Sequence, residues 1–261
     1  MNEFVSRYDS MIQDPLIREY YGQKDFFNVG YWLSNTLSQQ EACENLMDKL
    51  LAFLPEKKGT ILDVACGMGA TTSHLLKYYS ATDIEGINIS EKQLERCRVN
   101  APGCNFTLMN AVKLEFEDDL FDNIICVEAA FHFDTRERFL QEAWRVLKPG
   151  GHLVLSDIIF ETTEWLGDWM VPLKNNVKDM EEYKDVYLQA RFKQVELVDT
   201  TNQCWGEYCR RRMHWLQQTF LAGKLDEPTF REIMVVFDGL LNSSVRHYLL
   251  VSAKKPLPDL L

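Results

Sequence analysis

The segment that most constrains the fold is TILDVACGMG, which runs from Thr60 to Gly69. It joins an apolar run rich in β-forming residues to a pair of glycines, Gly67 and Gly69, and the next ten residues have the apolar spacing of an amphipathic helix. A strand that passes through a glycine turn into a helix brings backbone N–H groups close to a nucleotide-like ligand. Glycine suits such a turn because a Cβ would obstruct the ligand and because φ is often positive there. The segment therefore predicts an α/β fold with a ligand site at this turn.

Strand-like and helix-like segments alternate along most of the chain. The strand-like runs cover 60–66, 81–89, 104–110, 122–128, 152–158 and 193–201, followed by VRHYLLVSAKK near the end. Helical spacing covers 39–54, 90–100, 135–148, 160–190 and 205–240. The third of these helices has a capping-box pattern, with Asp134 as N-cap and Glu137 three residues later. The alternation predicts βαβ units and a mainly parallel, seven-stranded sheet with helices on both faces.

A chain of 261 residues favours a single domain with elaborations. We expect an N-terminal lid and helix at 1–55, a ligand-binding core at 56–158, a helical cap at 159–192 and 203–242, and closing strands at 193–202 and 243–255. Within the first part, residues 1–36 are rich in aromatic side chains and their pattern is irregular. These boundaries place the glycine turn inside the core.

Charge and cysteine content limit the partners of this chain. The 28 Lys and Arg residues against 39 Asp and Glu residues give a net charge of −11, which argues against nucleic acid or an anionic membrane surface as the main partner. The 7 cysteines are scattered without a C-x-x-C pair, so neither a disulfide framework nor a zinc knuckle is indicated. No apolar run reaches the length of a membrane span or resembles a leader. We expect a cytoplasmic protein without membrane insertion, and homodimer formation is compatible with these features.

The glycine turn departs from the dinucleotide-binding fingerprint. That fingerprint, G-x-G-x-x-G, uses its third glycine for close packing of helix on strand, and Thr72 stands at that position here. Asp63, inside the strand before the turn, is also foreign to the fingerprint. Both differences count against a nicotinamide-dependent dehydrogenase.

The order of motifs resembles the class I S-adenosylmethionine-dependent methyltransferases. TILDVACGMG is followed by EGINISEKQL, by the long run TLMNAVKLEFEDDLFDNIICVEAAFHF, and by EAWRVLKPGGHLVLSD. The chain looks similar to the branch that includes sterol, tocopherol, cyclopropane-mycolate and sugar O-methyltransferases, over about residues 25–157 with a continuation to 255. The resemblance implies a Rossmann-like fold with an N-terminal helical lid and helical cap insertions. It also implies S-adenosylmethionine as methyl donor, S-adenosylhomocysteine as product, a small-molecule acceptor and no metal.

The resemblance also assigns cofactor contacts. N–H groups after Gly67 and Gly69 suit the carboxylate of the cofactor, and Asp63 or nearby carbonyls suit its ammonium. Asn88 takes the place of an acidic ribose contact, with Gln93 as a second contact. The predicted cofactor-binding residues are Phe27, Asn28, Asp63, Ala65, Gly67, Gly69, Asn88, Ile89, Gln93, Asn110, Ala111 and Glu128.

His132 and Asp157 are the predicted catalytic residues. His132 matches a base proposed for sugar O-methyltransferases of this family, and Asp157 matches an acidic residue near it. A His–Asp pair can remove a hydroxyl proton while the displacement at the methyl carbon proceeds. We therefore expect O-methylation of a small, secondary-metabolite-type molecule. Two alternatives stay open: His132 only packs or orders the cofactor loop, or the enzyme methylates N or C of an amine, sterol or quinol-like metabolite.

The cap is the expected source of acceptor specificity. Its aromatic and apolar residues either line an acceptor pocket or form plain core, and they are Trp165, Trp169, Trp205, Tyr208, Met213, Trp215 and Phe220. Three consecutive arginines, 210–212, are expected to form a solvated basic edge in preference to an anchor for an acidic acceptor.

Overall fold

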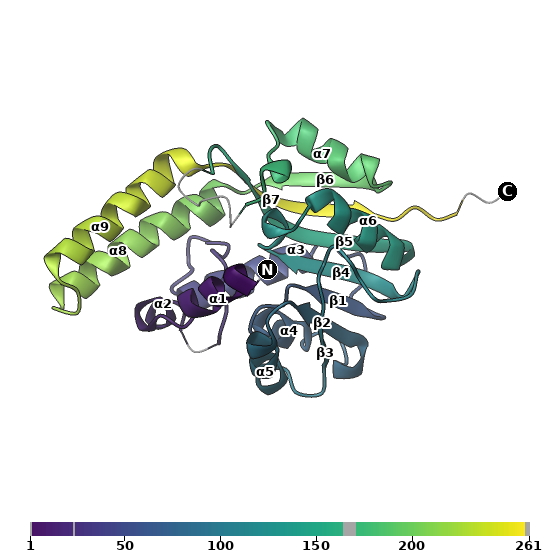
Figure 1. Cartoon of the computed structure of the whole chain (residues 1–261), viewed down its shortest axis with the longest axis horizontal. Coiled ribbons are helices and arrows are strands. Elements are labelled where there is room, and N and C mark those ends of the chain that lie inside the picture. Colours follow the sequence, from purple (N-terminus) through teal and green to yellow (C-terminus); the bar gives the residue numbers. More distant parts are fainter. Residues whose placement is uncertain (1, 23, 164–170, 259–261) are drawn as a thin grey trace.

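The seven strands form one mixed sheet in the order β3-β2-β1-β4-β5-β7-β6 (Figure 1). The structure is a computed structural model and describes residues 2–22, 24–163 and 171–258. The strands are β1 (Ile61–Val64), β2 (Ile84–Asn88), β3 (Asn105–Leu108), β4 (Phe121–Val127), β5 (Leu147–Phe160), β6 (Lys193–Asp199) and β7 (Val245–Lys254). Only β7 runs antiparallel to its neighbours, β5 and β6. The prediction of a Rossmann-like, mainly parallel sheet is confirmed.

The strand order changes direction between β1 and β4. From β1 the chain continues outward through β2 and β3 on one side, and β4 then begins the other half on the opposite side of β1. Both neighbours are parallel to β1, with Ile61 opposite Ile84 of β2 and Asn123 of β4. The carboxyl ends of β1 and β4 therefore lie side by side, at the place where doubly wound sheets bind their ligands.

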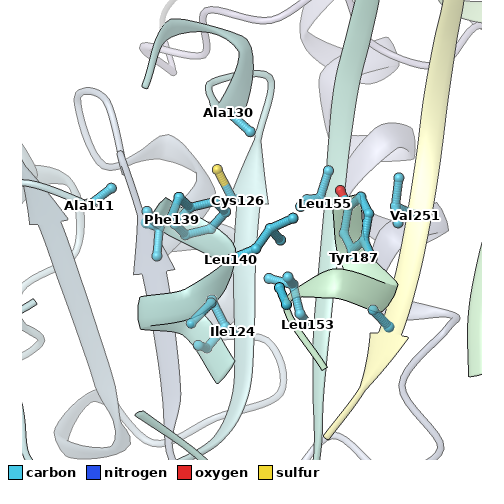
Figure 2. Close-up of a cluster of buried hydrophobic side chains, with 14 of the residues drawn as sticks. Ala111, Ile124, Cys126, Ala130, Phe139, Leu140, Leu153, Leu155, Tyr187 and Val251 are labelled. Atoms are coloured by element: carbon cyan, nitrogen blue, oxygen red, sulfur yellow. The ribbon is translucent and has the colours of Figure 1, made fainter. Parts of the chain in front are cut away.

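Helices cover both faces of the sheet because the side chains of each strand alternate between two apolar clusters. Ile124 packs in the cluster under α6 (Arg136–Val146) and α7 (Met180–Gln189), and Figure 2 shows part of that cluster. The next residue, Ile125, packs in the cluster under α3 (Gln39–Leu51) and α4 (Ala70–Leu75). The outer strands β2 and β3 carry α5 (Glu91–Asn100). A strand with both faces buried reads as a continuous apolar run, which is why these strands were visible in the sequence.

Two helices stand where the sequence pattern looked irregular. They are α1 (Asn2–Met11) and α2 (Pro15–Tyr21), so the N-terminal helices that the resemblance implied are confirmed, although the aromatic pattern there looked irregular. Asp14 starts α2, because its carboxylate accepts the N–H groups of Leu16 and Ile17 while Pro15 takes the first helical position. The α6 cap is also shifted by one residue: Thr135, not Asp134, accepts the N–H of Arg138.

The second part of the expected cap, 203–242, contains a helical hairpin that extends away from the sheet, whereas α7 of the first part packs on the sheet (Figure 1). The expected helix at 205–240 is in fact two, α8 (Glu207–Leu221) and α9 (Glu227–Gly239), with Gly223 at φ +72° in the connection and Asp226 as the N-cap of α9. Within the expected helix at 160–190 the regular helix is α7, and Trp165 and Trp169 lie outside the described residues. Among the described helices, none combines the length and apolar character needed to cross a bilayer.

Candidate functional site

A cavity of about 390 Å³ lies at the carboxyl ends of β1, β2 and β4 and is bordered by α1. Its size falls within the range of small-molecule sites. All of the predicted cofactor-binding residues line it except Asp63 and Gly69, and of the two predicted catalytic residues His132 lines it and Asp157 does not. The structure thus brings together residues that are up to about a hundred positions apart in the sequence, at the switch point of the sheet.

The two glycines of the turn have different surroundings. A Cβ on Gly67, at φ +55°, would meet no protein atom within 4 Å, so the backbone there faces open space in the cavity wall. Gly69 begins α4 at φ +86°, and a Cβ on it would lie 2.7 Å from Cα of Cys97 in α5. Gly67 therefore keeps the backbone accessible to a ligand, whereas Gly69 allows two helices to pack closely.

Asp63 lies behind the turn and anchors α4. Its Oδ2 accepts hydrogen bonds from the hydroxyls of Thr71 and Thr72, each at 2.7 Å, and the residue is 1% exposed. Burial raises the pKa of its carboxyl to about 6, although both hydrogen bonds favour the charged form. These bonds give a structural reason for a threonine at the position where the dinucleotide fingerprint has its third glycine. Asp63 thus faces α4 and does not line the cavity, where its ligand contact was expected.

Three residues other than glycine that line the cavity adopt left-handed backbone conformations, and one of them is Asp25 at φ +57°, in the loop before α3. Ala65 follows β1 at φ +56°, and Glu128 follows β4 at φ +53°. Each such conformation costs about 1–3 kcal/mol, and residues held this way concentrate at binding and catalytic sites. Because β1 and β4 are neighbours, Ala65 and Glu128 mark the switch point as the functional part of the sheet.

Glu128 connects three parts of the molecule at the cavity. Its Oε2 accepts the N–H of Val29, at 3.0 Å, from the loop before α3, and the hydroxyl of Tyr248, at 2.7 Å, from β7. Burial raises the pKa of this carboxyl to about 7, against the effect of both hydrogen bonds. Glu128 is therefore an acid that titrates near neutral pH inside the site.

The end of β2 is held by a network that the sequence did not reveal. The Asn88 side-chain amide donates to the Gly67 carbonyl and to Oε1 of Gln93, and its oxygen accepts the N–H groups of Ile89 and Ser90. All four hydrogen-bonding positions of the amide are thus in use, and a ribose contact from Asn88 would replace one of these bonds. Asp9 of α1 completes the network by accepting from Gln93 Nε2, at 2.6 Å, and from the Ser90 hydroxyl.

Helix α1 also covers His132 at the tip of β4. The imidazole lies 5.2 Å from the ring of Phe4 and 6.2 Å from the ring of Tyr8, measured between centroids. Both aromatic residues line the cavity together with Ile12. The spacing of positions 4, 8 and 12 is one helical face, and this signal in the sequence would have predicted the helix and its contribution to the site.

Asp157 belongs to a different environment from the one expected. Its Oδ2 accepts from Nε of Arg136, at 2.7 Å, and from the hydroxyl of Tyr183, at 2.8 Å, while Oδ1 accepts the N–H of Ile158. The side chain is fully buried under α6 and α7 and does not line the cavity. The predicted pairing of His132 with Asp157 is therefore not retained, because within the described structure the carboxylate binds a buried arginine in place of the imidazole.

The fold and the site define a class: an α/β protein whose glycine turn opens into a ligand cavity at the switch point of a seven-stranded sheet with a reversed last strand. Residues 62–155 match the family model of a methyltransferase domain. The chain is 32% identical to 27-O-demethylrifamycin SV methyltransferase of Amycolatopsis mediterranei (strain S699), over 98% of this chain and 97% of the relative. It belongs to the class I S-adenosylmethionine-dependent methyltransferases of small molecules.

Solved structures agree with this fold at low sequence identity. The cyclopropane synthase MmaA2 from Mycobacterium tuberculosis superposes with a TM-score of 0.75 at 18% identity, covering 97% of this chain and 98% of that one. Geranyl diphosphate C-methyltransferase from Streptomyces coelicolor A3(2) gives 0.66 at 15% identity, covering 97% of each chain. These likenesses extend over the lid and cap as well as the core.

Proposed function

We propose that this protein transfers the methyl group of S-adenosylmethionine to a hydroxyl group of a small-molecule acceptor, with His132 as general base. The observation that carries the proposal is that His132 lines the same cavity as the accessible Gly67 turn, under the cover of α1. Imidazole is the side chain best suited to accept a proton near neutral pH. The name of the relative from Amycolatopsis, which places its methyl group on oxygen, supports the same chemistry.

The residues around the cavity fit S-adenosylmethionine. The open space beside Gly67 leaves room for the carboxylate end of the cofactor against backbone N–H groups, with Ala65 beside it. Asn28 and Glu128 would hold the methionine portion, and the residues for the ribose and adenine would be Asn88, Ile89, Gln93, Asn110 and Ala111. When bound, the cofactor supplies a methyl group already activated by a sulfonium. The rings of Phe27 and Tyr8, 5.7 Å apart at this wall, are suitable neighbours for that cation.

The protein's own contribution to the reaction is positioning, exclusion of water and acceptance of one proton. Phe4 and Tyr8 of α1 cover the tip of β4 and shield it from solvent. An acceptor hydroxyl held within hydrogen-bonding distance of the His132 imidazole loses its proton to that ring as the oxygen attacks the methyl carbon in line. Methylation of a carbon or an amine would depend less on this base, which gives the proposal a clear test.

The cofactor and the base are tested separately. Calorimetry should show binding of S-adenosylhomocysteine and little or none of NAD, and stronger NAD binding would contradict the proposal. Labelled-methyl transfer to a panel of alcohols, phenols and amines then identifies an acceptor. With that acceptor, His132→Gln should lower turnover by about 10²–10⁴-fold and leave the affinity for S-adenosylhomocysteine unchanged. The exposed His214 in α8 provides the control variant His214→Gln. Unchanged turnover of His132→Gln would remove the base and favour N- or C-methylation.

A further inference from the structure

Arg212 is a buried charged side chain that pairs with no carboxylate in the described part of the chain. It lies in the middle of α8 and is 5% exposed. Neither its Nε nor its Nη1 has a hydrogen-bond acceptor among the described residues. Its neighbours Arg210 and Arg211 are exposed and both pair with Glu207. The expected solvated basic edge therefore describes the first two arginines of the run but not the third.

Aromatic rings lie against the guanidinium, and its Nε and Nη1 have no acceptor among the described residues. The Arg212 Cζ lies 4.3 Å from the ring centre of Tyr20 and 4.7 Å from that of Trp215. The Tyr20 hydroxyl is also buried and has no hydrogen-bond partner among the described residues. Tyr208 lies against Tyr20, with ring centres 6.1 Å apart. We call Arg212, Tyr20, Tyr208 and Trp215 the Arg212 cluster.

An arginine in this state is an energetic liability unless something binds it. Removing a guanidinium from water is costly, and contact with two aromatic faces recovers only part of that cost. Buried donors in native proteins are nearly always satisfied, so two unsatisfied donor nitrogens on one guanidinium point to an acceptor at this place. Nε and Nη1 of Arg212 lie on different edges of the guanidinium, so each can donate to one oxygen of a carboxylate or phosphate, and the nearby Tyr20 hydroxyl offers a further donor.

Two aromatic contacts connect the Arg212 cluster to a residue of the cavity wall. Phe27 lines the cavity, and its ring centre is 5.0 Å from that of Tyr21 in α2. Tyr21 in turn donates a hydrogen bond to the hydroxyl of Tyr208 in α8, at 3.3 Å. An unbroken series of aromatic side chains thus leads from the cavity to the cluster, between α2 and α8. A ligand reaching Arg212 from the cavity would have an apolar body and displace these rings.

We propose that the Arg212 cluster binds the acidic group of the methyl acceptor, a carboxylate or phosphate carried on an apolar body. The identity of this ligand as the methyl acceptor rests on the proposed function, whereas the binding of an oxyanion at Arg212 does not. A free inorganic anion has the same chemistry at its oxygens but lacks the apolar body. The experiment therefore compares the two sources directly.

Binding is tested on the full-length protein without any need for activity. Cinnamate, methyl cinnamate and inorganic phosphate serve as probes in calorimetry and thermal unfolding. We expect cinnamate to bind about tenfold or more tightly than its uncharged ester, and Arg212→Met to abolish this preference. The control Arg210→Met changes an exposed arginine on the same helix and should bind cinnamate like the wild type. Arg212→Met that still prefers cinnamate to the ester would overturn the proposal. So would phosphate that binds as well as cinnamate and depends equally on Arg212.

A second variant tests the same proposal if Arg212→Met does not fold. Tyr20→Phe retains the ring over the guanidinium and removes only the unpartnered hydroxyl. It should weaken cinnamate binding several-fold and leave the affinity for the methyl ester unchanged. Equal effects on acid and ester would contradict a polar contact from Tyr20 and overturn its place in the site.

Activity assays then separate this inference from the proposed function. With an acidic acceptor found in the methyl-transfer panel, Arg212→Met should raise KM by about tenfold or more and change kcat little, the opposite of the effect expected for His132→Gln. For an acceptor whose acidic group is esterified, KM should be the same in the wild type and in Arg212→Met. If no acceptor is methylated by the wild type, the proposed function fails while the cinnamate result still decides whether Arg212 binds an oxyanion. If the best acceptors are neutral and insensitive to Arg212→Met, the proposal is overturned and the methyltransferase function stands.

Discussion

Single substitutions at Gly67 and Gly69 should distinguish an effect on ligand binding from an effect on the packing of the fold. Both have positive φ, so alanine at either position carries a backbone cost of about 1–2 kcal/mol. At Gly67 the added methyl group would project into the cavity, and at Gly69 it would collide with the backbone of Cys97. Gly67→Ala should therefore fold, with an affinity for S-adenosylhomocysteine reduced about tenfold. Gly69→Ala should lose about 3 kcal/mol or more of unfolding free energy.

Calorimetry with S-adenosylhomocysteine and urea unfolding of the two variants measure these effects. The Gly69 variant acts as the control for backbone strain, because it shares the positive φ but lies outside the cavity lining. Wild-type affinity in Gly67→Ala would show that the ligand does not approach the turn at this residue.

Single residues were predictable from motifs where the backbone decides their position, and less so where side-chain partners decide it. Gly67, Ala111 and His132 line the cavity because each follows a parallel strand, and the carboxyl ends of these strands lie along the same edge of the sheet. Asp157 lies in β5, where a pairing with His132 was expected. Arg136 from α6 and Tyr183 from α7 donate hydrogen bonds to its carboxylate in place of His132. No spacing rule connects these three positions in the sequence.

Among the elements, α1 has the most direct influence on the cavity after the strands themselves. Asp9 accepts hydrogen bonds from the Ser90 hydroxyl after β2 and from the Gln93 amide of α5, and the rings of Phe4 and Tyr8 lie near the His132 imidazole. The position of α1 over the cavity therefore depends on hydrogen bonds made near one end of this short helix. Short helices are marginal without such tertiary contacts.

Asp9→Ala should loosen α1 without unfolding the core. The variant loses hydrogen bonds to a charged group, each worth about 1.5–3 kcal/mol when fully buried and less at this partly exposed site. We expect faster amide hydrogen exchange in residues 2–11, and affinity for S-adenosylhomocysteine reduced several-fold. Glu3→Ala removes an exposed carboxylate that pairs with Arg7 on the same helix and serves as the control. Equal exchange rates in Asp9→Ala and Glu3→Ala would contradict the anchoring role of Asp9.

Prediction of elements from the sequence succeeded where burial imposes a period and failed where it does not. The strands were located to within a few residues, most clearly the central ones, β1 and β4, because most of their residues are buried on both faces, although β5 begins five residues before the predicted start. In α2 the aromatic residues are divided between the sheet and α8, which obscured the helical period, whereas the spacing of positions 4, 8 and 12 at α1 was a helical signal that the sequence prediction did not use. The α8–α9 hairpin has large exposed apolar residues, such as Val235, in addition to its buried ones. Apolar residues therefore recur throughout 205–240, and this recurrence suggested one helix where the structure has two.

At the scale of the whole molecule, the cavity is the meeting point of the lid, the central strands and the reversed strand β7. Glu128 makes this connection, because Val29 and Tyr248 both donate to its carboxylate. Asp63 lies at the adjacent strand end and fixes α4. Burial raises the pKa of Asp63 to about 6 and that of Glu128 to about 7, so both carboxyls retain protons in the folded protein that they lose in the unfolded chain.

This difference makes the stability of the molecule depend on pH in a defined direction. Between the ordinary pKa of a glutamate, 4.5, and about 7, the folded state binds more protons at Glu128 than the unfolded state, so the unfolding free energy falls as pH rises through this window. Glu128→Gln keeps an oxygen acceptor for Val29 and Tyr248 but cannot titrate. From pH 5 to pH 8 it should therefore gain about 2–3 kcal/mol of unfolding free energy relative to the wild type, measured by urea titration at each pH. Glu142→Gln is the control, because hydrogen bonds from Arg145 and Leu114 lower the pKa of Glu142 and place its contribution below this window. Wild-type and Glu128→Gln curves that stay parallel from pH 5 to pH 8 would show that Glu128 is charged throughout, and that the polar bonds at the junction of lid, core and β7 outweigh its burial.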